Sequence, residues 1–227
     1  MNKQQTVFVV DDDRAARESL RWLLESVGHR VHCHDSAQAF MAEYDGATPG
    51  CLVLDVRMPG MSGLELQDHL RERGWCLPVI IVTGHGDVPM AVRAMRGGAV
   101  DFLQKPYNDQ VLLESIQRGL DICQQRSLER GRLSRIQAAY LMLSPREREV
   151  AEMVVNGNAN KVIAIELGLS PKTVEAHRAN AMDKMRARTL SELVRMFMLL
   201  ELGRDEFDLD DVPTTPSRGR IMEQARA

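Results

Sequence analysis

Four groups of polar side chains in the first half of the chain each follow a short apolar run, and together they have the chemistry of a phosphoryl-transfer site. They are Asp11, Asp12 and Asp13 after the first of five predicted strands, Asp55 at the end of the third, Thr83 at the end of the fourth and Lys105 after the fifth. Clustered carboxylates repel one another and need a cation, and oxygen ligands suit Mg²⁺. One carboxylate can then attack an activated phosphoryl group, while an ammonium and a hydroxyl neutralise the phosphoryl oxygens.

Each of these groups taken alone has a more ordinary interpretation. A single aspartate after a strand is usually a turn or cap residue, three consecutive acids often form a solvated loop, and short motifs match by accident. Four groups in order, each at a different strand end, are harder to explain in this way. Asp55 is the best nucleophile, because it closes the central strand and Asp11 and Asp12 lie at the adjacent strand end.

Five alternations of strand and helix signals position these side chains. Apolar runs predict strands near 7–10, 31–33, 51–56, 79–82 and 100–103, and helical spacing predicts helices near 16–27, 36–44, 64–70, 88–96 and 111–120. This order predicts an α/β doubly wound, five-stranded parallel sheet with helices on both faces. Ligands of such sheets bind outside the carboxyl ends of the strands, so the polar groups should converge on one rim.

Length and charge divide the chain further. Its 227 residues allow one large domain or two small ones, and 44% hydrophobic residues suffice for a globular core. Residues 1–120 carry 12 basic and 16 acidic side chains, residues 121–202 carry 13 and 10, and residues 203–227 carry 4 and 6. Only the middle segment is basic, which permits contact with nucleic acid but equally suits a solvated surface.

Composition also bears on where the protein works. No run of about 18 apolar residues is present to span a membrane, and the N-terminus lacks the basic-then-apolar pattern of a secretion signal. Cys33, Cys51, Cys76 and Cys123 form neither a close pair nor a metal-binding spacing. We therefore expect a cytoplasmic protein with reduced cysteines and no membrane contact.

The second half of the chain predicts an all-α, four-helix domain. Ser144 and Glu147 form a capping box at the first helix, Gly168 closes the second, and Ser170 caps a third over 170–186. A short helix, a glycine turn and a Ser-capped helix make a helix-turn-helix, whose second helix enters the major groove of DNA. The expected boundaries are 5–122 for the first domain, 123–140 for a helical linker, 141–203 for the second domain and 204–227 for a disordered acidic tail.

The third helix of this domain carries most of the candidate DNA contacts. Helical spacing directs Val174, His177, Ala181 and Met185 to the core, and therefore Lys172, Glu175, Ala176 and Ala179 to the opposite face. Glu175 can accept a hydrogen bond from cytosine N4, and Ala176 can touch a thymine methyl group. Phosphate contacts are expected from Lys161, Lys172, Thr173, Arg178 and Lys184. Surface solvation is an equal alternative for any one of these residues.

Each half of the chain resembles a known protein family. Residues 5–122 resemble the receiver domain of two-component response regulators, through VVDD at 9–12, LDVRMPGMSG at 54–63, TGH at 83–85 and KP at 105–106. Residues 141–203 resemble the LuxR-type helix-turn-helix domain, through LSPREREV at 143–150, NK at 160–161, LGLS at 167–170 and TVEAHRAN at 173–180. The helix with VPMAVRAM at 88–95 is similar to that of the FixJ-like subfamily. In the LuxR-type family Ser or Thr often caps the second helix, so Ala159 leaves this cap to Asn158 or Asn160, or the end frays.

The receiver resemblance implies a flavodoxin-like fold and a role for each residue at the rim. Asp55 would accept a phosphoryl group from a sensor histidine kinase, and Lys105 would pair with that group. Mg²⁺ would be bound by Asp12, Asp55 and the carbonyl of Arg57, with Asp11 helping through water.

The resemblance also implies a conformational switch. Thr83 would move toward the phosphoryl oxygen, and Phe102 would follow it inward, held by packing alone because it has no hydroxyl. Gly84 would leave space beside the phosphate. The Lys105–Pro106 peptide bond would be cis.

The FixJ-like subfamily further implies a homodimer that forms on phosphorylation. Val92 and Met95 would serve the core, which leaves Pro89, Met90 and Arg93 on the outside as the dimer interface. Paired DNA-binding domains would bind double-stranded promoter DNA and activate transcription, with RNA polymerase as a partner. No enzymatic activity is expected beyond Mg²⁺-dependent self-phosphorylation and autodephosphorylation.

Two alternatives remain open at this point. One is a DNA-binding or scaffold protein whose receiver is silent, although all the acceptor residues are present. The other is a phosphohydrolase of the haloacid-dehalogenase type, since Asp11 and Asp13 imitate its motif. Such enzymes have Thr or Val where this chain has Ala15, and they carry a cap segment that this chain lacks.

Overall fold

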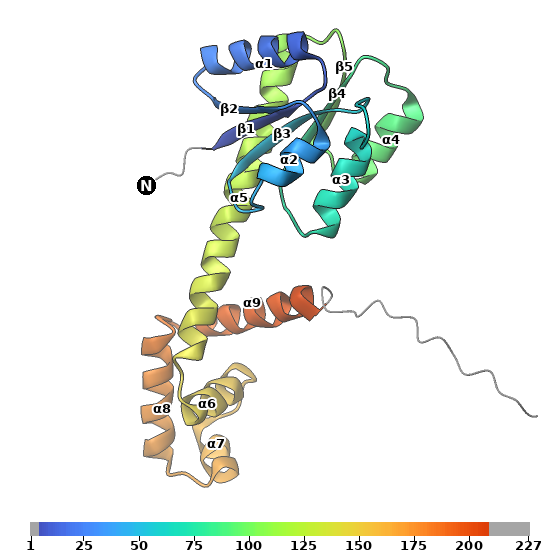
Figure 1. Ribbon diagram of the computed structural model, residues 1–227. Helices are drawn as coiled ribbons and strands as arrows, with labels where there is room; N and C mark the ends of the chain where they lie inside the picture. The colour runs from blue at the N-terminus through green and yellow to red at the C-terminus, as the bar shows by residue number, and fades with distance from the viewer. Residues whose placement is uncertain (1–4, 209–227) are drawn as a thin grey trace, which may run out of the picture. The chain divides into compact units, whose positions relative to one another are not determined.

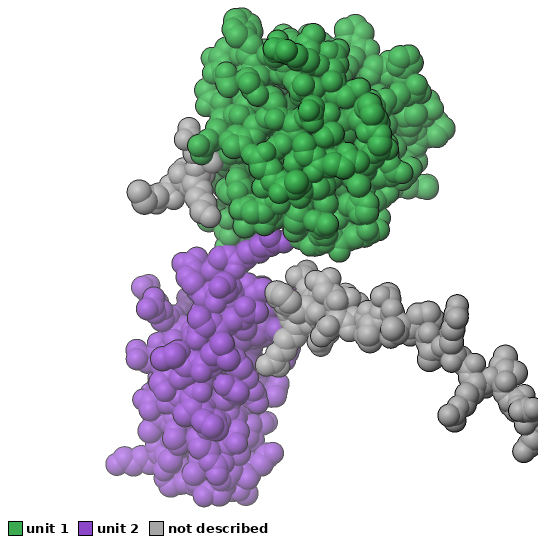
Figure 2. Space-filling view, viewed as in Figure 1, with its two compact units in different colours: residues 1–129 green, residues 130–227 purple. Residues whose placement is uncertain are grey.

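The computed structural model describes residues 5–208 of the chain. The chain divides into two compact units, residues 1–129 and 130–227 (Figure 2). No helix in the described part of the chain is long and apolar enough to cross a membrane.

The first unit contains a five-stranded parallel sheet with the strand order β2-β1-β3-β4-β5 (Figure 1). Its strands are β1 (Thr6–Val10), β2 (Arg30–His34), β3 (Gly50–Asp55), β4 (Val79–Thr83) and β5 (Asp101–Gln104). The register pairs Val10 with Leu54, Asp55 with Val82, and Thr83 with Gln104. The predicted sheet is therefore confirmed, and its register brings the polar strand ends to one edge.

Helices cover both faces of this sheet, as predicted. They are α1 (Arg14–Ser26), α2 (Ala37–Glu43), α3 (Gly63–Glu72), α4 (Val88–Arg96) and α5 (Asp109–Leu141). Side chains of β3 alternate between two cores: Leu52 packs with residues of α2, α3 and α4, and Val53 packs with residues of α1 and α5. The predicted last helix and the predicted linker form one continuous helix, α5.

The second unit is the predicted all-α helix-turn-helix domain. Its helices are α6 (Pro145–Val155), α7 (Asn160–Leu167), α8 (Pro171–Lys184) and α9 (Leu190–Asp208). Val150, Ile163, Val174 and Leu193, one from each helix, are fully buried in a core that also includes Ile136 of α5. Gly168 has φ 65°, a left-handed conformation that suits glycine in the turn between α7 and α8.

Two expectations for this unit turn out differently. Helix α9 does not end near Gly203 but continues to Asp208, so the first residues of the predicted disordered tail are helical. Residues 209–227 of that tail lie outside the described residues. Ala159 is the N-cap of α7 without a side-chain cap, and Asn160 instead accepts a hydrogen bond from Arg178.

The capping box of α6 is tied to the end of α8. The backbone N–H of Ser144 donates to Glu147 Oε2, and the Lys184 ammonium lies 2.6 Å from the same oxygen. The Glu147 side chain is only 6% exposed. The hydrogen bond from Lys184, followed by that from Ser144, lowers the pKa of Glu147 to about 2.

We therefore expect Glu147→Gln to lower the free energy of unfolding by about 1–2 kcal/mol at neutral pH, since the charge-assisted contacts are lost. A depressed pKa stabilises the fold above the carboxyl's unfolded value of 4.5, and this stability is lost as the pH falls toward about 2. Urea denaturation at pH 7 and pH 3 measures both effects. Glu149→Gln, which loses only an exposed pair with Arg146, is the matched control. Equal destabilisation by the two variants would contradict the assigned role of Glu147.

Candidate functional site

Two buried carboxylates share one ammonium at the carboxyl edge of the sheet. Lys105 Nζ lies 2.5 Å from Asp11 Oδ2 and 3.2 Å from Asp55 Oδ1. Asp11 is 1% exposed and Asp55 is 5% exposed. The second oxygen of Asp55 accepts a hydrogen bond from the Arg57 N–H at 2.8 Å, so the carboxylate is held at both ends.

Burial and neighbouring charges shift the pKa values of Asp55 and Lys105 in opposite directions. Burial raises the pKa of the Asp55 carboxyl, although the Lys105 ammonium acts in the opposite direction. Burial alone would lower the pKa of Lys105, but the hydrogen bonds and charges of Asp11 and Asp55 outweigh it and raise that pKa. The site thus holds a basic carboxylate beside a fixed positive charge, which suits attack on a phosphoryl group.

The other two aspartates of the acidic run have different surroundings. Asp13 caps α1 by accepting a hydrogen bond from Ala15 N, and its own N–H donates to Asp11. The capping role of Asp13 weakens the phosphohydrolase alternative, which needs that carboxylate for catalysis. Asp12 is exposed beside the site.

The donor set at this edge suits a hard divalent cation. Asp11 and Asp55 are buried together with a single ammonium, so their two negative charges are only partly balanced. Asp12 adds a third carboxylate nearby, and all available side-chain donors are oxygens, as Mg²⁺ prefers. Among the residues that the structure describes, no three His, Cys, Asp or Glu side chains gather as a ready metal site.

The predicted switch residues belong to the neighbouring strands: Thr83 ends β4, which pairs with β3, and Phe102 lies in β5, the next strand. Thr83 is fully buried, and its hydroxyl oxygen accepts a hydrogen bond from His85 N at 3.4 Å. Phe102 packs against the core, and a Cβ at Gly86 would lie only 2.8 Å from its ring. A Cβ at Gly84 would meet nothing within 4 Å, so this position is open.

Two further features lie next to Lys105 and Asp11: the Lys105–Pro106 peptide bond and the side chain of Arg17. The Lys105–Pro106 peptide bond is cis, as the resemblance implied. Arg17 of α1 donates a hydrogen bond to the Asp11 carbonyl at 2.6 Å. Sequence reasoning missed Arg17, because an arginine on the polar face of an amphipathic helix carries no signal of its partner.

The predicted orientation of α4 is partly wrong. Val92 and Met95 do not serve the core: they are 44% and 50% exposed. The core-facing side of α4 instead contains buried Ala94 and half-buried Met90, because small Ala94 lets the helix approach its neighbours closely. Of the predicted dimer-interface residues, Pro89 and Arg93 are exposed and Met90 packs against the core.

The second candidate site is the outer face of α8 in the helix-turn-helix. Four predicted contact residues there are exposed: Lys172, Glu175, Ala176 and Ala179. Lys161 is also exposed, on the first turn of α7. Ser170 caps α8 by accepting from Thr173 N, and its hydroxyl is 2.7 Å from the Thr173 hydroxyl. Val174 and Ala181 are buried on the opposite side, with His177 half-buried.

Two of the predicted phosphate contacts already have partners inside the domain. The Arg178 guanidinium donates to Asn160 Oδ1 at 3.3 Å, which joins α8 to α7. The Lys184 ammonium pairs with Glu147, as described above. Their contacts with phosphate stay predictions, and both side chains also have a structural role.

Two protein families match the chain, each within one of its compact units. Residues 7–117 match the response regulator receiver domain family. Residues 141–197 match the luxR family of bacterial regulatory proteins.

Similar proteins share both parts. The transcriptional regulatory protein FixJ of Azorhizobium caulinodans is 51% identical over 88% of this chain and 94% of its own length. The response regulator protein TmoT of Ectopseudomonas mendocina is 44% identical over 86% of this chain and 90% of its own. Among solved structures, the response regulator StyR has a TM-score of 0.79 at 44% identity, covering 86% of this chain and 98% of that one.

Proposed function

Because the chain belongs to the two-component response regulators that join a receiver domain to a LuxR-type DNA-binding domain, we propose that phosphorylation of Asp55 by a sensor histidine kinase controls its binding to promoter DNA. The observation that carries this proposal is the buried Asp55 carboxylate, held between Lys105 and the Arg57 N–H beside Asp11. The phosphoacceptor function belongs to residues 5–122 and DNA binding to residues 141–203, with 123–140 as the linker.

The phosphoryl transfer needs one nucleophile and a site that neutralises charge. A carboxylate oxygen of Asp55 attacks the phosphorus atom of the kinase's phosphohistidine. The phosphorus–nitrogen bond breaks, the imidazole leaves and takes up a proton, and an aspartyl phosphate forms. Autodephosphorylation reverses the modification: a water oxygen attacks the phosphorus, and the Asp55 carboxylate and inorganic phosphate are released.

The side chains around Asp55 have separate roles in this transfer. Asp11, Asp12, Asp55 and the Arg57 carbonyl would hold Mg²⁺, which supplies positive charge to the phosphoryl oxygens when bound. Lys105 leaves its carboxylate partners and pairs with the phosphoryl group. Catalysis by the chain is limited to its own phosphorylation and dephosphorylation.

The phosphorylated receiver then acts on the second domain. Thr83 turns its hydroxyl from His85 toward the phosphoryl oxygen, and Phe102 moves inward behind it. The surface of α4, with Pro89 and Arg93, pairs with that of a second copy. Two helix-turn-helix domains then bind two half-sites together, and contact with RNA polymerase activates transcription.

Intact-mass measurement after exposure to acetyl phosphate and Mg²⁺ tests the acceptor assignment. The wild type should gain the mass of one phosphoryl group, and peptide mapping should place it on Asp55. No gain in mass, or a phosphoryl group on Asp11 or Asp12, would contradict the proposal.

Mutation should separate the two kinds of DNA contact expected from α8, which are phosphate contacts and base contacts. Lys172→Ala is expected to weaken binding to all sequences and to reduce the slope of log affinity against log salt by about one, since one phosphate contact is lost. Glu175→Ala should cost about 1–3 kcal/mol at one base position and leave the others unchanged. Competition binding against a set of single-base variants at several salt concentrations measures both. Glu201→Ala, exposed on α9, is the control, and equal losses in all three variants would contradict these roles.

A further inference from the structure

A hydrogen bond connects α3 to α4 near the C-terminal end of α4. The buried Gln67 side chain donates from Nε2 to the Ala94 carbonyl at 3.0 Å. A Cβ at Gly97, the C-cap of α4, would lie 2.9 Å from the same nitrogen, so the Gln67 amide is packed closely under this end. This end of α4 therefore has little room to move.

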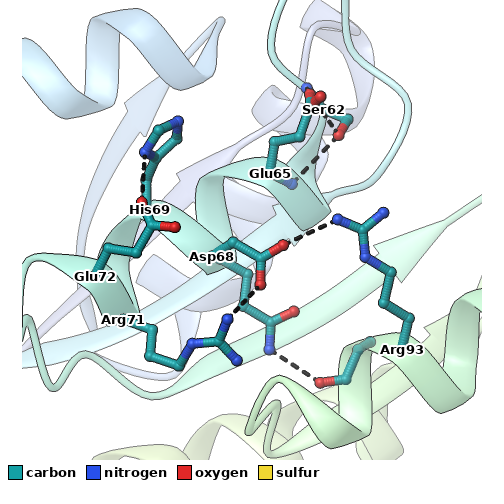
Figure 3. A network of polar contacts seen from close by, with 9 residues as sticks. Ser62, Glu65, Asp68, His69, Arg71, Glu72 and Arg93 are labelled. Atoms are coloured by element: carbon teal, nitrogen blue, oxygen red, sulfur yellow. Dashed lines mark hydrogen bonds and ion pairs between the residues drawn. The ribbon is translucent and has the colours of Figure 1, made fainter. Parts of the chain in front are cut away.

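An ion pair on the surface adds a second connection. The Arg93 guanidinium reaches from α4 to Asp68 of α3 at 2.9 Å (Figure 3). Asp68 also accepts from Arg71 of its own helix at 3.1 Å. Because Arg93 is turned toward α3 in this arrangement, its charged group is engaged within the receiver rather than with a partner molecule.

A groove lies beside the other end of α4. This largely apolar groove of about 700 Å³ separates that end from the loop after β3, with Met58 and Pro59 on one side and Pro89 and Met90 on the other. Arg93 also lines this groove. The four residues 84–87 connect this end of α4 directly to Thr83 at the phosphorylation site.

We propose that Asp68 is a positioning residue whose ion pair with Arg93 holds α4 in the resting position and so opposes phosphorylation of Asp55. This inference rests on the proposed function. Movement of Thr83 shifts residues 84–87, and the N-terminal half of α4 turns into the groove about the fixed point at Gln67. The Asp68–Arg93 pair breaks in that movement and releases Arg93 on the face expected to pair with a second copy.

The resting state is the one in which the ion pair is seen. Thr83 contacts His85, and Lys105 is paired with both Asp11 and Asp55, as expected without a phosphoryl group. Linkage then fixes the sign of the effect: loss of a contact made only in the resting state favours the state that phosphorylation stabilises. Exposed ion pairs contribute little, so the expected change is about two- to five-fold.

The test is the rate of phosphorylation of the full chain by acetyl phosphate and Mg²⁺, followed by intact mass. We expect Asp68→Asn to react two- to five-fold faster than the wild type. Arg71→Gln removes the other partner of Asp68 without touching α4, and Glu72→Gln makes the same charge change one turn further along α3. Both controls should react at the wild-type rate.

A methyl NMR measurement on Met90 gives a direct structural readout. In unphosphorylated Asp68→Asn, the Met90 signal should move part of the way toward its position in the wild type saturated with beryllium fluoride and Mg²⁺. General loss of structure would not produce a faster reaction together with this directed shift.

The possible results distinguish failure of the role proposed for Asp68 from failure of the proposed phosphorylation of Asp55. A wild type that accepts phosphoryl groups, with Asp68→Asn at or below the wild-type rate, overturns the inference alone. An equal gain in Glu72→Gln also overturns it, because charge rather than the ion pair would then be responsible. A wild type that accepts no phosphoryl group overturns the proposed function as well.

Discussion

Replacement of Asp55 by asparagine is expected to abolish both dimerisation and tighter DNA binding in response to a phosphodonor. The amide has nearly the shape of the carboxylate and can still accept from the Arg57 N–H, so the fold should be kept. It lacks the nucleophilic oxygen, so no acyl phosphate forms. Light scattering after size-exclusion chromatography, with and without acetyl phosphate and Mg²⁺, measures the loss.

The control for this experiment is Asp121→Asn, an equal chemical change at an exposed position on α5. It should dimerise with the phosphodonor like the wild type. Dimerisation of Asp55→Asn in response to the donor would contradict the assignment of the acceptor. Unresponsive size and affinity in the wild type itself would favour the silent-receiver alternative.

Removal of the Lys105 ammonium is expected to slow phosphorylation by about 100-fold, the order of loss when one preorganised charge partner of a transition state is deleted. Lys105→Met leaves Asp11 and Asp55 buried side by side without their shared cation. Their repulsion should raise the pKa of Asp55 beyond the increase that burial already causes. The rate is measured by intact mass with acetyl phosphate.

The same variant has a predicted dependence on pH. A carboxyl whose pKa is raised by folding binds more protons in the native state than in the unfolded state. The free energy of unfolding of Lys105→Met should therefore fall as the pH rises from the ordinary carboxyl value of 3.8 through the raised pKa of Asp55, and urea denaturation over a pH series that starts below 3.8 measures it. Lys105→Arg keeps the charge and should show a weaker dependence. An unchanged rate in Lys105→Met would contradict the role assigned to the ammonium.

The sheet and the acidic site could be predicted because their signals are local. Apolar runs mark buried parallel strands, and the residue after each run must lie at the same rim, whatever the details of packing. This is why Asp11, Asp55 and Lys105 could be brought together from sequence. Helix caps are similarly local, and Ser144 and Ser170 cap the helices that follow them, as predicted.

The orientation of α4 could not be predicted from local sequence signals. Helical spacing shows which residues share a face, but Val92 and Met95 are large and apolar and yet exposed, while Ala94 is buried. The deciding fact is the close approach of α3 through Gln67, which lies 27 residues from Ala94 in sequence. The partners of Lys184 and Arg178 were hidden for the same reason, since each ion pair or hydrogen bond joins residues that are far apart in the sequence.

In the proposed function, the receiver controls the DNA-binding domain. The most direct test is the affinity of the full chain for a DNA fragment that the protein itself has selected from genomic fragments, measured before and after reaction with acetyl phosphate and Mg²⁺ at one fixed salt concentration. We predict clearly tighter binding by the phosphorylated protein, with two copies on the fragment. Equal affinity and equal stoichiometry in the two states, with the phosphoryl group shown by mass to be on Asp55, would contradict the claim.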